Sequence, residues 1–254
     1  MACVSSGKAL RAAPIKYEVS RKAAGGSWEV LGATGSLAYN DRTAGAGTTY
    51  YYRVRAFSPT TKAWSGYSET RTIKTPNPFT DVSESDGYYK AIMWAYNKGI
   101  VKGTSADTFS PKSPSTRGQT ATMLYRFAGK PAVGSVTNPF TDVKESDGYY
   151  TPIMWAYSNK IVNGFPGTTL FKPGQTITRG QIVQILWNMA GKPKASGVTN
   201  PFTDVKETDG YYKAIMWAVA KGITKGTSET TFSPKADCTR AQIVTFLYRY
   251  DGLK

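Results

Sequence analysis

The sequence contains no histidine, which removes the side chain that most often acts as a general base or a metal ligand in proteins. Its two cysteines, Cys3 and Cys238, lie in unrelated contexts, so the sequence offers neither a disulfide framework nor the ligand spacing of a zinc site. No apolar run reaches the roughly 18 residues that a membrane-spanning helix requires. We therefore expect no catalytic residue, no cofactor, no metal site and no membrane insertion.

The pattern of a secretory leader is also missing. Residues 1–6 have neither the basic start nor the apolar core of a signal peptide. We therefore expect either a cytosolic protein or a piece of a longer secreted one.

Acidic residues are scarce relative to basic ones. The chain of 254 residues has 17 Asp and Glu against 32 Lys and Arg, which gives a formal net charge of +15. The excess is spread over both the first 76 residues and the remainder, without a basic tract. Such a surface attracts nucleic acid, anionic lipid or acidic polysaccharide, and charge alone does not choose among them.

Residues 1–76 have the signals of a small all-β domain. Alternating patterns predict strands over residues 16–21, 28–31, 50–57 and 68–74, separated by glycine-rich turns. In the clearest strand, the side chains of Tyr50 and Tyr52 belong to one face and those of the intervening residues to the other. Short strands at regular spacing are typical of a sandwich.

The order of these patterns resembles the later strands of a fibronectin type III domain. The resemblance covers about residues 14–75 and includes the run Gly-Thr-Thr-Tyr-Tyr-Tyr-Arg-Val-Arg-Ala-Phe that ends at Phe57. A sandwich of that kind needs roughly 90–100 residues and seven strands. We therefore expect shortened or missing first strands, either because the chain is cut from a longer protein or because another segment covers an open sheet edge. The first explanation is favoured.

Three near-copies of one segment fill the rest of the chain. They open with Asn-Pro-Phe-Thr-Asp-Val at Asn77, Asn138 and Asn200, so their starts are 61 and 62 residues apart. Each copy continues with an aromatic-rich segment around a tryptophan and ends with Thr-Arg-x-Gln. Copies that keep their internal spacing predict structural modules that pack against one another.

Each copy predicts a helix, a structured loop and a second helix. In the first copy, we expect Asp86 to cap a helix over residues 87–98 and Gly99 to follow it in the left-handed conformation. Thr116 and Gln119 predict a capping box at the start of the second helix. The apolar stripe of the first helix consists of Tyr89, Ile92, Met93 and Tyr96.

The shared pattern is Phe-Thr-Asp-Val, then Tyr-Tyr-x-x-Ile-Met-Trp-Ala, then Phe-x-Pro and Thr-Arg-x-Gln. It resembles the S-layer homology motif in all three copies, over nearly their full length. The resemblance implies a multidomain fold: the small all-β sandwich, followed by a mainly α, pseudo-threefold trimer of helix-loop-helix repeats. In that family, grooves between the repeats bind an anionic, often pyruvylated, secondary polymer attached to bacterial peptidoglycan. The expected domains are residues 1–76 for the β part, and 77–137, 138–199 and 200–254 for the repeats.

The arginine of each Thr-Arg-x-Gln run is the first candidate for binding that polymer. Its planar guanidinium can donate two hydrogen bonds to one carboxylate. Because a cation in a first helical turn is poorly placed for the helix dipole, we expect a nearby anionic group, either a ligand or a neighbouring acid. The candidates are Arg117, Arg179 and Arg240.

Two departures from the family pattern bear on the ligand. Gln119, Gln181 and Gln242 stand where the motif usually has glutamate, so each groove loses a negative charge and the pyruvylated ligand is put in doubt. The second copy diverges further, with Lys160 at the position of Gly99 and with Phe165-Pro166-Gly167 in its loop. Its groove is expected to be the weaker one.

Three further sets are candidates for ligand contact, each with a structural alternative. The aspartates cap a helix or turn, or orient the arginine; the tryptophans pack in the core or stack on sugar rings; the glycines serve a turn or allow close ligand approach. Acidic clusters at the helix starts are read as caps and dipole partners rather than as catalytic acids or a calcium loop. The three sets are Asp81, Asp142 and Asp204; Trp94, Trp155 and Trp217; and Gly103, Gly164 and Gly226.

The leading functional hypothesis is a non-catalytic module that anchors a protein to the cell wall, with the β domain as a spacer. The alternative is a structural, self-assembling surface protein, in which the repeats are scaffold and the β domain contacts other copies or a surface-protein partner. A nucleic-acid partner is not expected, because the sequence has no nucleic-acid-binding motif and no basic stripe. The number of occupied grooves and the identity of the glycan are left open by the sequence.

Overall fold

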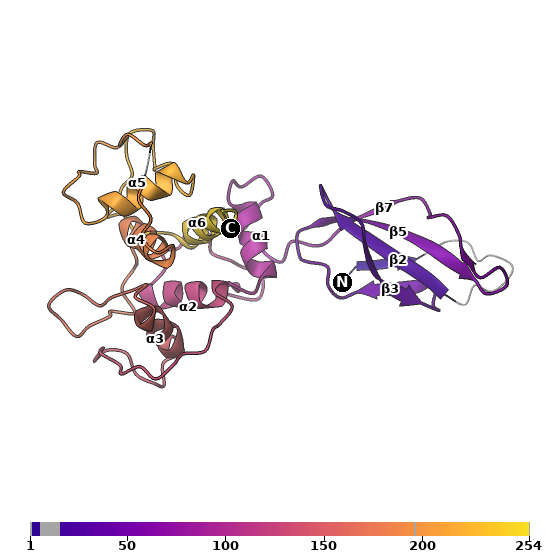
Figure 1. Ribbon diagram of the computed structural model, residues 1–254, viewed down its shortest axis with the longest axis horizontal. Coiled ribbons are helices and arrows are strands. Elements are labelled where there is room, and N and C mark those ends of the chain that lie inside the picture. Colours follow the sequence, from indigo (N-terminus) through magenta and orange to yellow (C-terminus); the bar gives the residue numbers. More distant parts are fainter. Residues whose placement is uncertain (1, 6–15, 196, 254) are drawn as a thin grey trace. The chain divides into compact units, whose positions relative to one another are not determined.

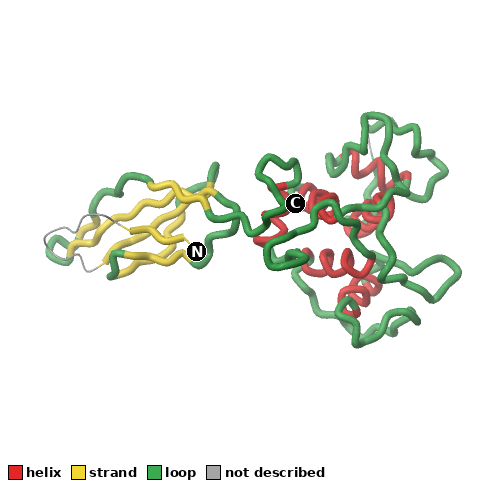
Figure 2. The backbone as a smooth tube through the Cα atoms, turned by 180° about the vertical axis from the view of Figure 1, so that it is seen from behind, coloured by secondary structure: helices red, strands yellow, loops and turns green. Residues whose placement is uncertain are grey.

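A computed structural model describes residues 2–5, 16–195 and 197–253, and the chain forms two compact units, Met1–Pro78 and Phe79–Lys254. Within the described residues, strands lie in the first unit and helices in the second (Figures 1 and 2). The strands are β1 (Ala2–Ser5), β2 (Lys16–Ala23), β3 (Glu29–Thr34), β4 (Ala38–Asp41), β5 (Thr49–Ser58), β6 (Ala63–Trp64) and β7 (Arg71–Lys74). The helices are α1 (Tyr89–Asn97), α2 (Arg117–Phe127), α3 (Tyr150–Ser158), α4 (Arg179–Met189), α5 (Tyr212–Ala220) and α6 (Arg240–Asp251).

The first unit contains two antiparallel sheets. The larger has the order β3-β2-β5-β6, with β7 also paired to β5, and the smaller pairs β1 with β4. The predicted strands at β2, β3 and β5 are confirmed, whereas β7 begins three residues later than predicted. Tyr50 and Tyr52 are buried on one face of β5, as its alternation indicated. The pattern analysis missed β1, β4 and β6, which have two to four residues each and are too short to show a period.

A charged network lies inside this small core. The carboxylate of Asp41, which is 3% exposed, accepts hydrogen bonds from Arg21 Nη1 (2.6 Å) and Tyr52 Oη (2.8 Å) through Oδ2, and from Thr43 Oγ1 (2.8 Å) through Oδ1. Arg21 also pairs with Glu29 across β2 and β3. Because buried charges are tolerated only when they are paired and hydrogen-bonded, these residues fix how β4 packs on the larger sheet.

The helix boundaries follow local signals that the sequence shows. The threonine side chain accepts a hydrogen bond from the third residue of α2, α4 and α6, and the glutamine there bonds back, so the predicted capping box is confirmed in all three repeats. Gly99 has the predicted left-handed conformation (φ 67°), and Lys160 adopts the same one (φ 58°). The prediction that Asp86 caps α1 is wrong: its carboxylate accepts from the backbone N–H of Ser83 and closes the preceding turn.

The three repeats contact one another in a closed cycle. Helix α2 of the first repeat packs on α3 of the second, α4 of the second on α5 of the third, and α6 of the third on α1 of the first. A single apolar core runs through all three repeats. Its largest fully buried side chains include Phe109, Phe171 and Phe232, one from each loop. Each repeat therefore completes the hydrophobic face of its neighbour.

A ring of backbone hydrogen bonds links the repeats just before α2, α4 and α6. The N–H of Ser115 donates to the C=O of Cys238 (3.0 Å), that of Ile177 to Ser115 (2.9 Å), and that of Cys238 to Ile177 (2.8 Å). The first two N–H groups of each helix also donate to carbonyls of a neighbouring repeat, as Arg117 does to Gln175 and Gly118 to Pro173. The N–H groups that a helix leaves unsatisfied at its start are thus used for assembly.

The thiol of Cys238 reports on the integrity of this ring. It is fully buried, and burial raises its pKa to about 12, so almost no reactive thiolate forms at neutral pH. In a Cys3→Ser background, we expect the folded protein at pH 8 to resist a thiol reagent and the protein in denaturant to react stoichiometrically. Rapid labelling of the native protein would show that the ring opens.

Candidate functional site

Each candidate arginine crosses from its own repeat into the next one. Arg117, Arg179 and Arg240 are 8%, 3% and 8% exposed. Their Nε atoms donate to loop carbonyls of the following repeat: Arg117 to Phe171 (2.8 Å), Arg179 to Phe232 (2.9 Å) and Arg240 to Phe109 (2.9 Å). Each guanidinium also lies over the ring of that phenylalanine, 4.5–4.8 Å from its centroid.

No acid pairs with these arginines within the described residues, although the sequence led us to expect an anionic neighbour. Backbone carbonyl oxygens, which carry partial negative charge, accept hydrogen bonds from these guanidinium groups instead. Burial lowers the pKa of Arg117, Arg179 and Arg240 from the ordinary value, yet arginine stays protonated at neutral pH. Each junction between repeats therefore contains a buried, charged guanidinium that has no ion-pair partner among the described residues and interacts only at longer range with the loop aspartate of the next repeat.

The predicted aspartates hold the loops that receive these arginines. Asp142 Oδ1 accepts from the N–H of Phe171 (2.8 Å) and Oδ2 from that of Lys172 (2.7 Å). Lys172 has a left-handed backbone (φ 56°), which a non-glycine residue adopts at some cost. Asp81 and Asp204 make the same two contacts in their repeats. The aspartates thus position the arginines indirectly, since the residue whose N–H they bind also supplies the acceptor carbonyl.

The predicted glycines are required by packing in the same loops. A Cβ atom at Gly103, Gly164 or Gly226 would approach loop carbonyl oxygens to 2.4–2.8 Å and a phenylalanine ring to 2.7–3.1 Å. Close packing therefore accounts for all three glycines. Gly164 and Gly226 also line grooves, as described below.

The tryptophans pack between helices. Trp155 and Trp217 are 5% and 2% exposed, so neither presents a ring face to a sugar. Trp94 is partly exposed and packs against Tyr248 and Phe127. None of the three lines a groove described here. The core alternative of the sequence analysis therefore accounts for Trp155 and Trp217.

Two junctions carry an open groove built by all three repeats. The groove at the junction of repeats 1 and 2, called the 1/2 groove, has a volume of about 350 Å³. It is lined by Arg117 of the first repeat, by the loop and α4 of the second, and by Tyr211 of the third. The 2/3 groove, of about 410 Å³, contains Arg179 of the second repeat, the loop and α6 of the third, and Tyr88 of the first. The two grooves are therefore built from equivalent elements, and each element of the 2/3 groove comes from the repeat that follows its counterpart in the 1/2 groove.

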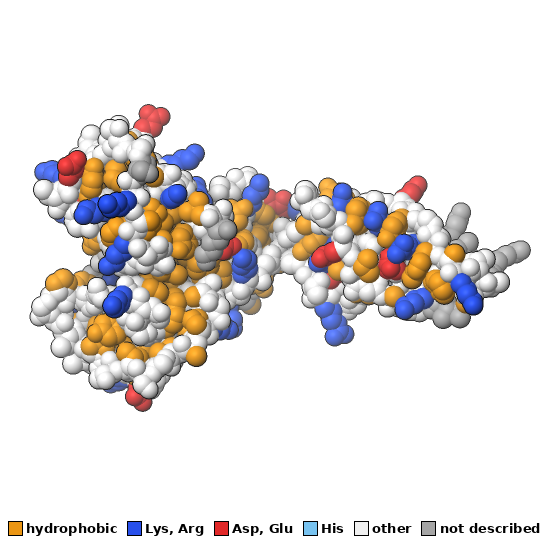
Figure 3. Space-filling view, viewed as in Figure 1, with side chains coloured by type: hydrophobic (Ala, Val, Ile, Leu, Met, Phe, Trp, Pro, Cys, Tyr) orange, Lys and Arg blue, Asp and Glu red, His pale blue; other side chains and the backbone are white. Residues whose placement is uncertain are grey.

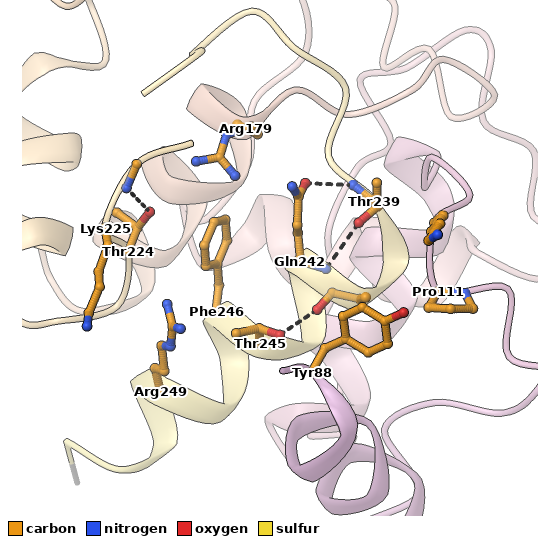
Figure 4. Close-up of a pocket in the computed structure, with 13 residues that line it drawn as sticks. Tyr88, Pro111, Arg179, Thr224, Lys225, Thr239, Gln242, Thr245, Phe246 and Arg249 are labelled. Carbon is orange, nitrogen blue, oxygen red and sulfur yellow. Dashed lines mark hydrogen bonds between the residues drawn. The ribbon is translucent and has the colours of Figure 1, made fainter. Parts of the chain in front are cut away.

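Figure 4 shows the 2/3 groove, where Arg179, Lys225 and Arg249 lie around the side chain of Phe246. Thr245 and Gln242 come from the same helix face, and Tyr88 lies on the other side of α6. No Asp or Glu lines either groove. Lysine and arginine side chains also outnumber acidic ones over the face of the molecule in Figure 3. The grooves can thus accept an anionic group without an opposing carboxylate.

Sequence reasoning missed one position of the second helix, which lines the grooves as Asn188 and Arg249. Arg126, Asn188 and Arg249 occupy equivalent positions, and each donates to the carbonyl of the isoleucine that opens the loop of its own repeat. Tyr88 and Tyr211, which precede α1 and α5, were also missed as groove residues. The sequence did contain a signal for this position of the second helix, because it is arginine in the first and third repeats and asparagine in the second.

The described residues show no sign of a metal centre or a membrane span. No group of three or more His, Cys, Asp or Glu side chains among them is close enough to share a metal ion. None of the described helices combines the length and apolar character that a bilayer crossing requires.

The profile of the S-layer homology domain matches residues 78–121, 139–183 and 201–244, which together make up more than half of the chain. The chain therefore belongs to the S-layer homology domain family, with three copies of the domain that follow a β-rich N-terminal unit.

Curated relatives match about two thirds of the chain. The chain is 27% identical over 181 residues to a cellulosome-anchoring protein of Acetivibrio thermocellus. The matched stretch covers 69% of this chain and 39% of that protein. It is 32% identical over 174 residues to an endoglucanase of Bacillus sp., covering 65% and 18%. It is 25% identical over 176 residues to an S-layer protein of Bacillus thuringiensis subsp. finitimus, covering 68% and 21%. The chain thus spans less than half the length of each of these relatives.

Proposed function

We propose that this chain is a non-catalytic anchoring module, which holds a protein at a bacterial cell surface by binding an anionic polymer of the cell wall. The polymer that best fits is a secondary polysaccharide linked to peptidoglycan. The observation that carries the proposal is the construction of the grooves: each places a buried arginine, which forms no ion pair among the described residues, beside open space that no described Asp or Glu lines. Further cations line the 2/3 groove, and polar and apolar side chains line the 1/2 groove. Membership of the family and the relatives named for anchoring and for the S-layer support it.

The remaining expectations belong to the same proposal. The cyclic contacts and the ring of hydrogen bonds support approximate threefold symmetry among domains at residues 77–137, 138–199 and 200–254. Residues 1–76 form a fibronectin type III-like spacer in this proposal. Of the predicted site residues, the arginines are the candidates for ligand contact, whereas the aspartates and glycines shape the loops that receive them.

Binding to isolated walls tests this function. The chain should sediment with purified cell-wall sacculi and should stay in solution after acid extraction has removed the secondary polymer. Binding should weaken steeply between 0.1 M and 1 M NaCl, because the screening length falls from about 10 Å to about 3 Å. Sedimentation with extracted walls, or no sedimentation with any intact wall while the chain is folded, would contradict the proposal and favour the scaffold alternative.

The charges at the groove rim make better probes than the buried arginines. Replacing Arg117, Arg179 or Arg240 removes contacts between repeats as well as charge, so a loss of binding would have two explanations. A Lys225→Asn, Arg249→Asn variant changes only groove residues, and Asn188 shows that asparagine can keep the hydrogen bond to the loop. The Lys130→Asn, Lys192→Asn variant is the charge-matched control, because both lysines are exposed, have a left-handed backbone that asparagine tolerates, and line neither groove.

A further inference from the structure

The three junctions differ in charge at equivalent positions. The loop residue beside the glycine is Lys102, Asn163 or Lys225, and the second-helix residue is Arg126, Asn188 or Arg249. The 2/3 groove is lined by four cations, which include Lys112, whereas the 1/2 groove has Arg117 alone. The junction between the third and first repeats has Arg240, Lys102 and Arg126 at the same positions. The junction between the first and second repeats is therefore the least cationic of the three at these positions.

The guanidinium groups also differ in what they bind. Nη2 of Arg240 donates to the carbonyl of Lys102 (2.9 Å), and Nη2 of Arg117 donates to that of Asn163 (3.3 Å). Nη2 of Arg179 is buried and has no hydrogen-bond acceptor among the described residues. Figure 4 shows this guanidinium at the edge of the 2/3 groove, on the side of the Thr224–Lys225 segment.

A single side chain explains why that acceptor is missing. Thr224 stands where the other repeats have Val101 and Val162, and its hydroxyl accepts a hydrogen bond from the N–H of Gly226 (3.3 Å). Gly226 has a positive φ of 88°, whereas the equivalent glycines do not. The Lys225 carbonyl and the Gly226 N–H belong to one peptide, so the bond of this N–H to Thr224 accounts for a carbonyl that accepts no hydrogen bond from Arg179.

We propose that the grooves are not equivalent, and that the 2/3 groove is the principal site for the anionic group of the ligand. The exposed cations attract the anion, and the unsatisfied Nη2 donor of Arg179 fixes it with a charge-assisted hydrogen bond. This inference rests on the proposed function for the identity of the polymer, and it adds which groove receives its negative charge.

The 1/2 groove binds an uncharged part of the polymer or no ligand. Asn163 and Asn188 replace its rim cations, and Arg117 has used its Nη2 donor on the loop. The ring of Phe165 forms a wall of this groove, with Arg117 4.9 Å and Lys172 4.4 Å from its centroid. This wall is apolar and aromatic, so it favours a sugar ring over a carboxylate.

Small probes can test the ranking without wall material. The backbone amides of Gly226, Gly164 and Gly103 report on the 2/3 groove, the 1/2 groove and the third junction in NMR spectra of the full chain. Sodium D-glucuronate should shift Gly226 at the lowest concentration, Gly103 at higher ones and Gly164 least. The neutral methyl glucoside, at the same ionic strength, should leave Gly226 unshifted. An equal response of Gly164 and Gly226 to glucuronate would overturn the proposal.

Exchanging residues between the grooves gives a reciprocal test. The Lys225→Asn, Arg249→Asn variant should bind glucuronate at Gly226 at least tenfold more weakly, and the Asn163→Lys, Asn188→Arg variant should gain a response at Gly164. The Lys130→Asn, Lys192→Asn control should match the wild type. Unchanged affinity in the first variant would show that the rim cations do not select the anion.

The Thr224→Val variant tests the free donor separately from charge. It removes the hydroxyl that turns the loop, so the Lys225 carbonyl can satisfy Arg179 as its counterparts do in the other repeats. Affinity for glucuronate should fall several-fold although the net charge is unchanged. Wild-type affinity would exclude a role for the Arg179 donor.

The outcomes for the groove and for anchoring can be told apart. A chain that responds to glucuronate at Gly226 but does not sediment with walls would keep the groove assignment and lose the proposed function. A chain that sediments with walls equally well with and without Lys225 and Arg249 would keep the function and lose the assignment.

Discussion

Replacing Asp41 with asparagine should destabilise the N-terminal unit by about 3–5 kcal/mol, which is the usual effect of removing one partner of a buried ion pair. Arg21 would keep its charge beside a neutral amide, and Tyr52 and Thr43 would lose their charged acceptor. A β unit of this size has only a few kcal/mol of stability. We therefore expect hydrogen exchange in β5 to approach the unfolded rate, while α2 and α4 keep their protection.

The matched control is Glu69→Gln, which removes an exposed carboxylate from the same unit. It should change exchange in β5 little, because exposed charges contribute at most about 1 kcal/mol. If the Asp41 variant retains full protection in β5, the network is not what holds this unit together.

The same residue makes the stability of this unit depend on pH. Burial alone would raise the pKa of Asp41, but hydrogen bonds from Thr43, Tyr52 and Arg21 outweigh burial and hold this pKa below its ordinary value. A depressed folded-state pKa adds stability above the unfolded-state value of about 3.9, and this stability is lost as the pH falls through the folded pKa. The protection factors of the β5 amides, which correct for the intrinsic exchange rate at each pH, should therefore fall below about pH 4 in the wild type, and this component should be absent in Asp41→Asn.

Local signals in the sequence predicted the parts of the fold that depend on near neighbours. The capping boxes at Thr116, Thr178 and Thr239 involve residues three apart, so the sequence contains both partners. The alternation in β5 likewise put Tyr50 and Tyr52 on one face of the strand, and the structure shows that both are buried. The prediction for Asp86 was wrong although its partners are also local. A carboxylate before a helix can accept from the helix N–H groups or from its own turn, and the sequence does not distinguish these two contacts.

The contacts that define the site lie between repeats, and spacing along the chain does not predict them. Arg240 binds the carbonyl of Phe109, 131 residues away. Such an acceptor is a backbone atom, which leaves no residue type to recognise in the sequence. For Asp142, a cap and an arginine-orienting role were alternatives in the sequence, and both contacts are present at the peptide between Phe171 and Lys172.

The divergence of the second repeat was visible in the sequence, but its meaning was not. Lys160 and Phe165 marked that repeat as unusual, and its groove was expected to be the weaker one. The structure adds that the charge differences fall at Asn163 and Asn188, which face the same open space. The turn at Thr224 was not predictable, because threonine and valine have the same shape and differ here only by one hydroxyl contact.

Replacing Arg240 with alanine should destabilise the repeat unit by about 3–4 kcal/mol. The change leaves the carbonyls of Phe109 and Lys102 without their donors and opens a space over the Phe109 ring. Each buried group left unsatisfied costs about 1–3 kcal/mol, and the lost packing adds to it. Denaturant unfolding, followed by hydrogen exchange in α1 and α6, measures the effect at the junction that closes the cycle of repeats.

The three arginines, compared in one series, separate assembly from binding. Arg240 makes two short bonds to loop carbonyls, Arg117 makes one short and one long bond, and Arg179 makes one. Alanine substitution should therefore destabilise the fold most at Arg240, less at Arg117 and least at Arg179. The loss of anion binding should be greatest at Arg179, whose Nη2 donor is free. If stability and binding fall in the same order, the arginines act only through the fold, and the anion is held by the rim cations alone.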